Sequence, residues 1–298
     1  MNNVIAWLHA IRLRTLPLSL AGVLVGGAIA YSEGCCNYVV VLLCALTAVF
    51  LQVLCNLSND IGDFKKGVDS AQRVGPARVM QGEEITERGM WCAIIISALL
   101  AMFTGLFLLY HAYTIDVVVF VIFILLGLGA LAAAVFYTLG ARPYGYNGLG
   151  DVFCFLFFGV VAVVGTFYLA AGTMRMAVLL PGAAFGLFSN AVLNLNNMRD
   201  MVNDKAYGKN SVVVKFGITW AKYYHGVLVF LPFVLLSLFV WLGHYPIYSW
   251  SFWALFPFFV VDYRGIINNN DFAFYDRYLE RQAIKTTVMA LVFCLGML

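Results

Sequence analysis

Two short segments of the sequence place acidic and amide side chains at helical spacing. They are Asn56, Asp60 and Asp63 in the first segment, and Asn196, Asp200 and Asp204 in the second. At 100° per residue, the first three fall within about 60° of one another, and the second three advance by about 40° at each step. Each segment is therefore expected to present one amide and two carboxylates on a single face of a helix.

Carboxylates that share a helix face are suited to binding a hard divalent cation. They repel one another and are costly to remove from water, and a cation between them offsets both penalties. Mg²⁺ prefers oxygen ligands and usually binds one or two carboxylates together with the phosphate oxygens of a substrate. Two such helix ends facing each other across a cavity would hold two Mg²⁺ ions that clamp a diphosphate. Nearby Arg and Lys side chains could bind its remaining oxygen atoms.

The composition indicates that the helices carrying these segments lie in a membrane. Of the 298 residues, 63% are hydrophobic and 11% are charged, and the mean hydropathy is +0.89, whereas soluble domains carry about 25% charged residues. A bilayer core needs about 20 apolar residues per helix. The apolar runs predict an all-α membrane protein with about nine transmembrane helices in a single domain, 1–298. The predicted spans are 15–33, 38–57, 91–112, 115–139, 151–172, 176–198, 223–243, 246–262 and 283–298.

The positions of the basic residues test this arrangement of spans. With the N-terminus in the cytoplasm, 17 of the 18 Lys and Arg residues fall in cytoplasmic segments, and Arg175 falls outside. The positive-inside rule predicts such a bias, and a shift by one missed helix would destroy it. The net charge of +3 says little about nucleic acid, because the basic residues simply follow the membrane rule, and no nucleic-acid partner is expected.

Both acidic segments continue an apolar span without a break, so each is predicted to form the cytoplasmic end of a helix. Gly67 follows Asp63 by four residues, and Gly208 follows Asp204 by the same number, where a helix C-cap is expected. The two halves of the chain therefore each carry a copy of the same motif, a helix end with one amide and two carboxylates. A diphosphate at the cytoplasmic face with an apolar tail in the bilayer describes a polyprenyl diphosphate, which is the predicted substrate.

Two other interpretations stay open at this point. Either segment alone is compatible with an ordinary solvated loop, although two copies in a chain so poor in charge weaken that interpretation. A secondary transporter would use intramembrane carboxylates as ion sites and duplicated halves as inverted repeats. The acids lie at cytoplasmic helix ends and both segments run in the same direction, which disfavours a transporter.

Further short segments add a resemblance to a known family. They are 12–17, 73–79, 137–146, 148–151 and 208–217. With the two acidic segments they cover nearly the whole chain, which resembles the UbiA superfamily of intramembrane prenyltransferases. The acidic pairs mark the superfamily. Gly75-Pro76, Arg142-Pro143-Tyr144 and Asn196-Asn197-x-Arg199-Asp200 resemble the branch that acts on 1,4-dihydroxy-2-naphthoate in menaquinone synthesis.

The resemblance implies nine transmembrane helices around a central cavity that opens to the cytoplasm and sideways to lipid. It assigns Asn59, Asp60 and Asp63 to a first Mg²⁺ ion, with Asn56 and Asp69 lining the site. It assigns Asp200 and Asp204 to a second ion, oriented by Asn196 and Asn197. Candidates for the diphosphate oxygens are Arg142, Arg199 and Lys209. Tyr137, Tyr144 and Tyr146 lie beside these polar residues and are candidates for cation–π contacts or for anchoring at the membrane interface.

The reaction implied by the resemblance is transfer of a polyprenyl group from an all-trans polyprenyl diphosphate to 1,4-dihydroxy-2-naphthoate. The ring would attack the prenyl cation at the carbon that bears the carboxylate, and loss of CO₂ and diphosphate would give demethylmenaquinol. The expected location is a bacterial inner membrane, with the active site facing the cytoplasm. Related enzymes that prenylate 4-hydroxybenzoate, homogentisate or haem remain alternatives for the acceptor.

Overall fold

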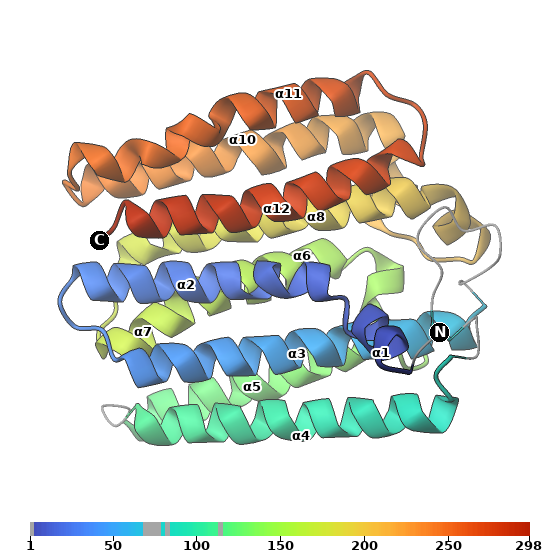
Figure 1. Ribbon diagram of the computed structural model, residues 1–298, viewed down its shortest axis with the longest axis horizontal. Helices are drawn as coiled ribbons and strands as arrows, with labels where there is room; N and C mark the ends of the chain where they lie inside the picture. Colours follow the sequence, from blue (N-terminus) through green and yellow to red (C-terminus); the bar gives the residue numbers. More distant parts are fainter. Residues whose placement is uncertain (1–2, 68–78, 81–83, 113–115) are drawn as a thin grey trace.

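The computed structural model describes residues 3–67, 79–80, 84–112 and 116–298. Within these ranges the chain is helical and contains no β-strand, so the prediction of an all-α protein is confirmed. Figure 1 shows the long helices side by side in one bundle, with the short α1 set across one end. The elements are α1 (Asn3–Ile11), η1 (Leu13–Thr15), α2 (Leu16–Ser32), α3 (Tyr38–Lys65), α4 (Glu87–His111), α5 (Val117–Phe136), η2 (Tyr144–Asn147), α6 (Gly150–Cys154), η3 (Phe155–Gly165), α7 (Thr166–Ala171), η4 (Met176–Val178), α8 (Leu179–Ala206), α9 (Val212–Phe216), α10 (Ile218–Leu242), η5 (Ile247–Leu255), α11 (Phe256–Ile267) and α12 (Phe274–Leu295).

Six helical stretches of the described chain are long and apolar enough to cross a membrane. They are Tyr38–Lys65, Glu87–His111, Val117–Phe136, Gly150–Ala171, Met176–Ala206 and Ile218–Leu242. The pair Val4–Ile11 and Leu16–Ser32, bent by 49°, raises the number to seven if it counts as one span. The two predicted spans nearest the C-terminus are helical but fall outside this group. One is divided into η5 and α11, and α12 begins with several charged residues. The expected number of about nine is therefore not confirmed.

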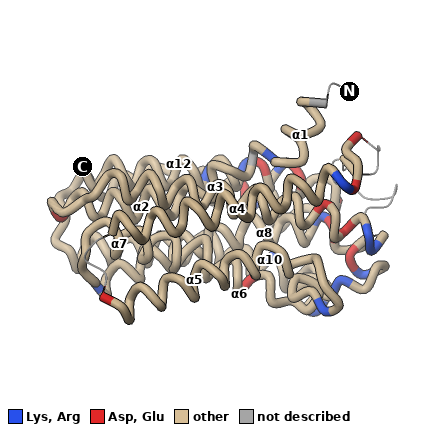
Figure 2. The backbone as a smooth tube through the Cα atoms, turned by 90° about the horizontal axis from the view of Figure 1, so that it is seen from below, with Lys and Arg blue, Asp and Glu red and all other residues tan. Residues whose placement is uncertain are grey.

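Charged residues are concentrated at one end of the bundle (Figure 2). The C-terminal ends of α3 and α8, which carry the two acidic segments, both lie at this end (Figure 1). In the described part of the chain, the loops after α2, α4 and α7 carry only Glu33, Asp116 and Arg175 as charged residues. The charges therefore separate along the axis of the bundle, as the positive-inside rule predicts for a membrane protein.

The predicted span at 151–172 is not a regular α-helix, because its middle part, η3, is a π-helix between α6 and α7. Helix α2 packs so closely against it that a Cβ on Gly26 would lie 2.3 Å from the Val163 carbonyl oxygen. On the other side, a Cβ on Gly159 would lie 2.4 Å from the Gly182 carbonyl oxygen of α8. Small residues therefore allow the close packing that holds η3 between α2 and α8.

Both acidic segments lie in the last turns of long helices, as predicted. Helix α3 ends at Lys65 and α8 ends at Ala206, two residues beyond the last acid of each segment. Gly67 and Gly208 follow with φ values of 68° and 74°, a left-handed conformation that glycine adopts without steric penalty. The same local sequence pattern therefore ends both helices in the same way.

Candidate active site

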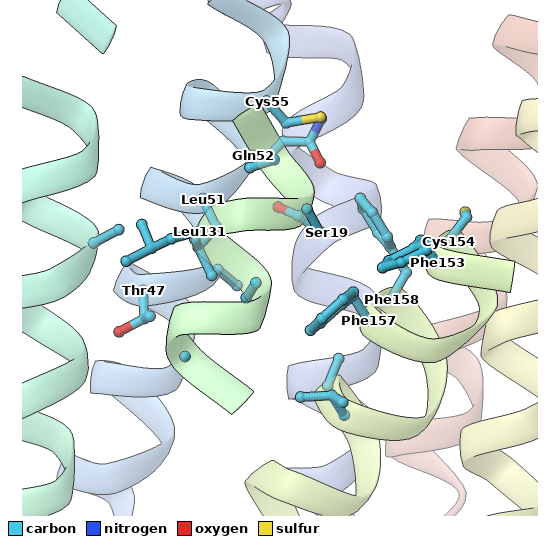
Figure 3. A pocket seen from close by; sticks show the side chains of 18 of the residues that line it. Ser19, Thr47, Leu51, Gln52, Cys55, Leu131, Phe153, Cys154, Phe157 and Phe158 are labelled. Atoms are coloured by element: carbon cyan, nitrogen blue, oxygen red, sulfur yellow. The ribbon is translucent and has the colours of Figure 1, made fainter. Parts of the chain in front are cut away.

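A cavity of about 530 Å³ lies between α2, α3, α4, α5, η3 and α8. Its polar lining, at the charged end of the bundle, consists chiefly of Arg12, Asn56, Asn59, Asp63, Tyr137, Asn196 and Lys209. Its apolar lining includes Val23, Leu51, Leu109, Phe123, Phe157 and Leu169. Figure 3 shows Phe153, Phe157 and Phe158 on one part of the wall and Leu51 and Leu131 on another. One end of the cavity suits an anion and the remainder suits a hydrocarbon chain.

The cavity also reaches the outer surface of the bundle. Met102 and Leu106 of α4 and Leu128 of α5 line it, and each of these side chains is also exposed. The opening therefore lies between α4 and α5, on the apolar surface. A hydrocarbon chain could extend through it from the cavity into lipid, in agreement with the sideways opening that the resemblance implies.

The acids of the first segment are buried at the polar end of α3. Asp60 forms an ion pair with Arg12, which lies at the break between α1 and η1. Arg12 adopts φ 56° and ψ 64°, a left-handed conformation that costs a non-glycine residue about 1–3 kcal/mol. Asp63 accepts a hydrogen bond of 2.9 Å from the hydroxyl of Tyr146. Residues far away in the sequence therefore orient both carboxylates.

The two amides of the first segment both line the cavity but make different contacts. Asn56 Nδ2 donates to the Ile11 carbonyl oxygen at 2.8 Å and to Thr15 Oγ1 at 3.2 Å, which ties α3 to the end of α1 and to η1. Asn59 Oδ1 accepts a hydrogen bond of 3.2 Å from Thr138 Oγ1, in the turn after α5. Asn56 therefore holds helices together as well as facing the cavity.

Arg199 is the centre of the second segment, and its side chain is only 2% exposed. It donates two hydrogen bonds of 2.8 and 2.7 Å to Asp200 and one of 2.9 Å to Asn196. It also forms an ion pair with Asp276, at the start of α12. A guanidinium held on three sides positions Asp200. The binding of diphosphate oxygens by Arg199 stays a prediction.

Asp204 has a buried acceptor atom that no described residue hydrogen-bonds. Lys209 Nζ lies 3.4 Å from Asp204 Oδ1, but Oδ2 has no hydrogen-bond partner among the described residues. Asn197 lies two turns earlier on the same face, and its buried Oδ1 is also unpartnered within the described ranges. Unsatisfied buried acceptors are rare and costly, so each of these two oxygen atoms, about 10 Å apart along the helix, is a position where a cation or a donor is expected.

Tyr146 connects the two acidic helix ends. Its hydroxyl donates to Asp63, and Lys66 Nζ and Lys209 Nζ lie 4.1 and 5.8 Å from its ring centroid. Lys209 in turn contacts Asp204. The structure therefore brings the first and second segments together at one end of the cavity, through a tyrosine in η2.

A row of aromatic rings leads from this end of the cavity along its wall. Tyr137 contacts Tyr144 edge to face at 5.3 Å between ring centroids, and Tyr144 lies 4.2 Å from Phe153. Phe153 stacks on Phe157 at 6.3 Å. Figure 3 shows the Phe153 and Phe157 side chains on the cavity wall. Ring faces in this position attract a cation that forms beside them.

Two residues assigned by the resemblance do not join this group. Arg142 lies in an exposed turn after α5 and is not part of the cavity lining that the described residues form, so its contact with the diphosphate stays a prediction. Asp69 lies outside the described residues. Conversely, Arg12 and Asp276 belong to the site but are not among the residues assigned from the sequence. The sequence offers a reason to consider Arg12, because it is a charged residue shortly before an apolar span. No sequence feature points to Asp276.

The oxygen donors at the second segment fit Mg²⁺. Asp204 Oδ2 is a buried carboxylate oxygen without a hydrogen-bond partner in the described chain, and Mg²⁺ commonly combines one or two carboxylates with water and phosphate oxygens. Among the residues that the structure describes, no three His, Cys, Asp or Glu side chains are grouped closely enough to hold a metal ion. Phosphate oxygens of a substrate and water would supply the other ligands of such an ion.

The fold and the cavity define a multi-pass helical membrane protein with a site for an amphiphilic anion. The UbiA prenyltransferase family matches residues 19–274, and the chain belongs to this family. It is 41% identical to the 1,4-dihydroxy-2-naphthoate octaprenyltransferase of Escherichia coli (strain K12), over 98% of this chain and 94% of that protein. It is 34% identical to the 1,4-dihydroxy-2-naphthoate octaprenyltransferase of Mycobacterium tuberculosis, over 73% of this chain and 72% of that protein.

Solved structures support the fold. The apo structure of a UbiA homolog from Aeropyrum pernix K1 superposes with a TM-score of 0.67 at 15% identity, covering 94% of this chain and 96% of that one. A UbiA homolog from Archaeoglobus fulgidus bound to GPP and Mg²⁺ superposes with a TM-score of 0.61 at 16% identity, covering 98% of each chain. At such low identity, these similarities concern the arrangement of the helices.

Proposed function

We propose that this chain transfers a polyprenyl group from an all-trans polyprenyl diphosphate to 1,4-dihydroxy-2-naphthoate, with release of CO₂ and diphosphate, to give demethylmenaquinol. The observation that carries the proposal is the cavity, which is polar where the two acidic helix ends meet and apolar along the rest of its length. This shape suits a diphosphate with a long hydrocarbon chain. The choice of acceptor follows the names of the relatives that are 41% and 34% identical.

Mg²⁺ is the proposed cofactor, with one ion at each acidic helix end. The proposed ligands are Asn59, Asp60 and Asp63 for one ion, and Asp200 and Asp204, with Asn196 and Asn197 as orienting amides, for the other. Bound there, Mg²⁺ would neutralise the negative charge of the leaving diphosphate. Because Asp60 and Asp200 already contact arginines, the proposal depends most on Asp63 and Asp204. Asp204 Oδ2, which has no hydrogen-bond partner in the described chain, supports it.

Cationic side chains at the polar end are proposed to bind and orient the diphosphate. Lys209 and Arg12 both line the cavity, so their donors can reach phosphate oxygens. Positive charge there stabilises the charge that builds up as the allylic C–O bond breaks. The apolar wall keeps out water, which would capture the prenyl cation, and the rings of Tyr137 and Phe153 face the same space.

The bond changes in the proposed reaction balance without an added oxidant or reductant. The electron pair of the C–O bond leaves with the diphosphate, and the prenyl carbon becomes a cation. The electron-rich naphthalenediol ring forms the new C–C bond at the carbon that bears the carboxylate. The electron pair of the bond to the carboxylate then returns to the ring as CO₂ leaves. The protein therefore has to bind, orient and shield the reactants.

The proposal also sets the orientation of the chain. We place it as a single domain in a bacterial inner membrane, with the N-terminus and the active site on the cytoplasmic side. The charged end of the bundle (Figure 2) supports this orientation, because Lys and Arg favour cytoplasmic loops. The polyprenyl tail would then lie in the bilayer, and the acceptor would enter from the cytoplasm.

An assay of the detergent-purified protein tests the proposal. It contains Mg²⁺, a polyprenyl diphosphate and either 1,4-dihydroxy-2-naphthoate or 4-hydroxybenzoate, with an EDTA control. We expect a prenylated product from the naphthoate, none from the benzoate, and none with EDTA. Product from 4-hydroxybenzoate alone would assign a different acceptor. No diphosphate release with any acceptor would contradict the proposal and favour the secondary transporter.

A further inference from the structure

One wall of the cavity carries a buried polar side chain to which the proposed reaction gives no role. Gln52 of α3 lines the cavity and is 8% exposed. Its Oε1 has no hydrogen-bond partner in the part of the chain that the structure describes. Figure 3 shows the Gln52 side chain on the cavity wall, with Cys55 and Ser19 on the same part of that wall.

The hydrogen bonds around Gln52 determine which atom of its amide faces the cavity. The Ile11 carbonyl oxygen can only accept, so the Asn56 atom at 2.8 Å from it must be Nδ2. Asn56 Oδ1 is then the acceptor for Gln52, and the Gln52 atom at 3.0 Å from it must be Nε2. The amide orientation is thus set by the network, so Oε1, a buried acceptor without a partner in the described chain, is the Gln52 amide atom left for a ligand of the cavity.

The neighbouring wall has the same chemical character. The hydroxyl of Ser19 donates a hydrogen bond of 2.8 Å to the Leu16 carbonyl oxygen, so its Oγ can only accept from a ligand. Thr47 also lines the cavity, but it donates to the Leu43 carbonyl oxygen at 2.8 Å and contacts Thr104 Oγ1 at 3.0 Å. The wall at Gln52 therefore favours a ligand that donates a hydrogen bond.

We infer that Gln52 is a specificity-determining residue for the aromatic acceptor, and that its Oε1 accepts a hydrogen bond from the hydroxyl remote from the acceptor's carboxylate. The inference rests on the proposed function. In a dihydroxynaphthoate, the hydroxyl beside the carboxylate bonds to that carboxylate, which leaves the remote hydroxyl as the free donor. Gln52 lies seven residues before Asn59, about 10 Å along the helix. A ring bound there would lie beside the first carbons of a prenyl chain whose diphosphate is held at the acidic segment.

Replacing Gln52 with methionine in the full-length protein tests the inference, because methionine has a similar length and lacks the acceptor. Gln52→Met should raise the KM for 1,4-dihydroxy-2-naphthoate about tenfold, the effect of one lost hydrogen bond, and change the KM for polyprenyl diphosphate by less than about twofold. The competitive inhibition constant of 1-hydroxy-2-naphthoate, which lacks the remote hydroxyl, should be the same in variant and wild type. This pattern of constants would assign the loss of acceptor affinity to the remote hydroxyl group.

Thr104→Val is the control, because it removes a buried hydroxyl of α4 that donates to the Leu100 carbonyl oxygen at 2.8 Å and does not belong to the cavity lining formed by the described residues. It should leave both KM values unchanged. An unchanged acceptor KM in Gln52→Met, or a rise that 1-hydroxy-2-naphthoate shares equally, would overturn the inference.

A measurement on the wild-type protein covers the case in which Gln52→Met does not fold. In equilibrium binding without prenyl diphosphate, the dihydroxy compound should bind about tenfold more tightly than 1-hydroxy-2-naphthoate, and equal affinities would overturn the inference. Failure of the wild-type protein to form any prenylated product would count against the proposed function. The comparison of the two naphthoates would still test whether the remote hydroxyl donates a hydrogen bond to the protein.

Discussion

The hydroxyl of Tyr146 donates a hydrogen bond of 2.9 Å to Asp63, although 83 positions separate the two residues in the sequence. The ring of the same tyrosine lies 5.8 Å from Lys209 Nζ, and that ammonium lies 3.4 Å from Asp204. The segment after α5 therefore joins the acidic ends of α3 and α8. The polar end of the cavity is assembled from three separate parts of the chain.

Removing the Tyr146 hydroxyl should weaken the use of metal without removing the ring that the lysines contact. In Tyr146→Phe, Asp63 loses a hydrogen bond, and a bond to a charged group contributes about 1.5–3 kcal/mol. We expect the Mg²⁺ concentration for half-maximal activity to rise about tenfold or more. The measurement is a Mg²⁺ titration of initial rates.

Tyr144→Phe is the control for this change, since it removes a hydroxyl from the same 3₁₀ turn. The Tyr144 hydroxyl donates to the Ala133 carbonyl oxygen at 2.8 Å and not to an acid. Its loss should leave the Mg²⁺ dependence unchanged. Equal titration curves for both variants would contradict the role of Tyr146.

Asp204→Asn should lower activity alone, whereas Asp200→Asn should lower both activity and thermal stability. Asp204 is buried and its Oδ2 has no partner in the described ranges, so Asp204→Asn should lower turnover about 100-fold with little change in thermal stability. Asp200 receives two hydrogen bonds from the buried Arg199. Asp200→Asn should therefore lose activity and also unfold at a lower temperature. Breaking a buried ion pair usually costs about 3–5 kcal/mol of unfolding free energy. The loss in Asp200→Asn should be smaller, because Asp276 still contacts Arg199.

Thermal unfolding in detergent and initial rates, measured on both variants, check this prediction. Retained activity in Asp204→Asn would remove Asp204 from the site. A large loss of stability in that variant would mean that its carboxylate serves the fold.

Gly62 is required for the contact between α3 and the turn after α5. A Cβ at this position would lie 2.4 Å from Thr138 Oγ1, and Thr138 is fully buried with a hydrogen bond of 3.0 Å to the Ser58 carbonyl oxygen. Gly62→Ala should therefore destabilise the protein by about 1–3 kcal/mol. Gly127→Ala, where a Cβ would meet no atom of the described chain within 4 Å, should leave the unfolding temperature unchanged or raise it slightly. Similar unfolding temperatures for both variants would show that Thr138 can move aside.

The features that could be predicted from the sequence are local ones. The spacing of Asp60 and Asp63, and of Asp200 and Asp204, placed each pair on one helix face, and Gly67 and Gly208 marked the helix ends. Apolar runs and the bias of basic residues likewise depend on the membrane, which acts on each span separately. These patterns were sufficient for the class of protein and for the two acidic segments.

The features that could not be predicted depend on contacts between distant residues. The pairing of Arg12 with Asp60 spans 48 positions, and that of Arg199 with Asp276 spans 77. No local periodicity predicts such pairs, which arise when helices pack. Gln52 is an intermediate case, because it lies four residues before Asn56 on the same helix face, but its free acceptor follows from the network with Ile11.

The most direct test of the central claim, that both acidic helix ends bind one diphosphate through Mg²⁺, is equilibrium binding of an unreactive prenyl thiodiphosphate. The wild-type protein, Asp63→Asn and Asp204→Asn would each be titrated with Mg²⁺ present and with EDTA. We expect tight binding by the wild-type protein with Mg²⁺, weakened about tenfold or more by either substitution and by EDTA. Binding that survives EDTA, or that either substitution leaves unchanged, would contradict the claim.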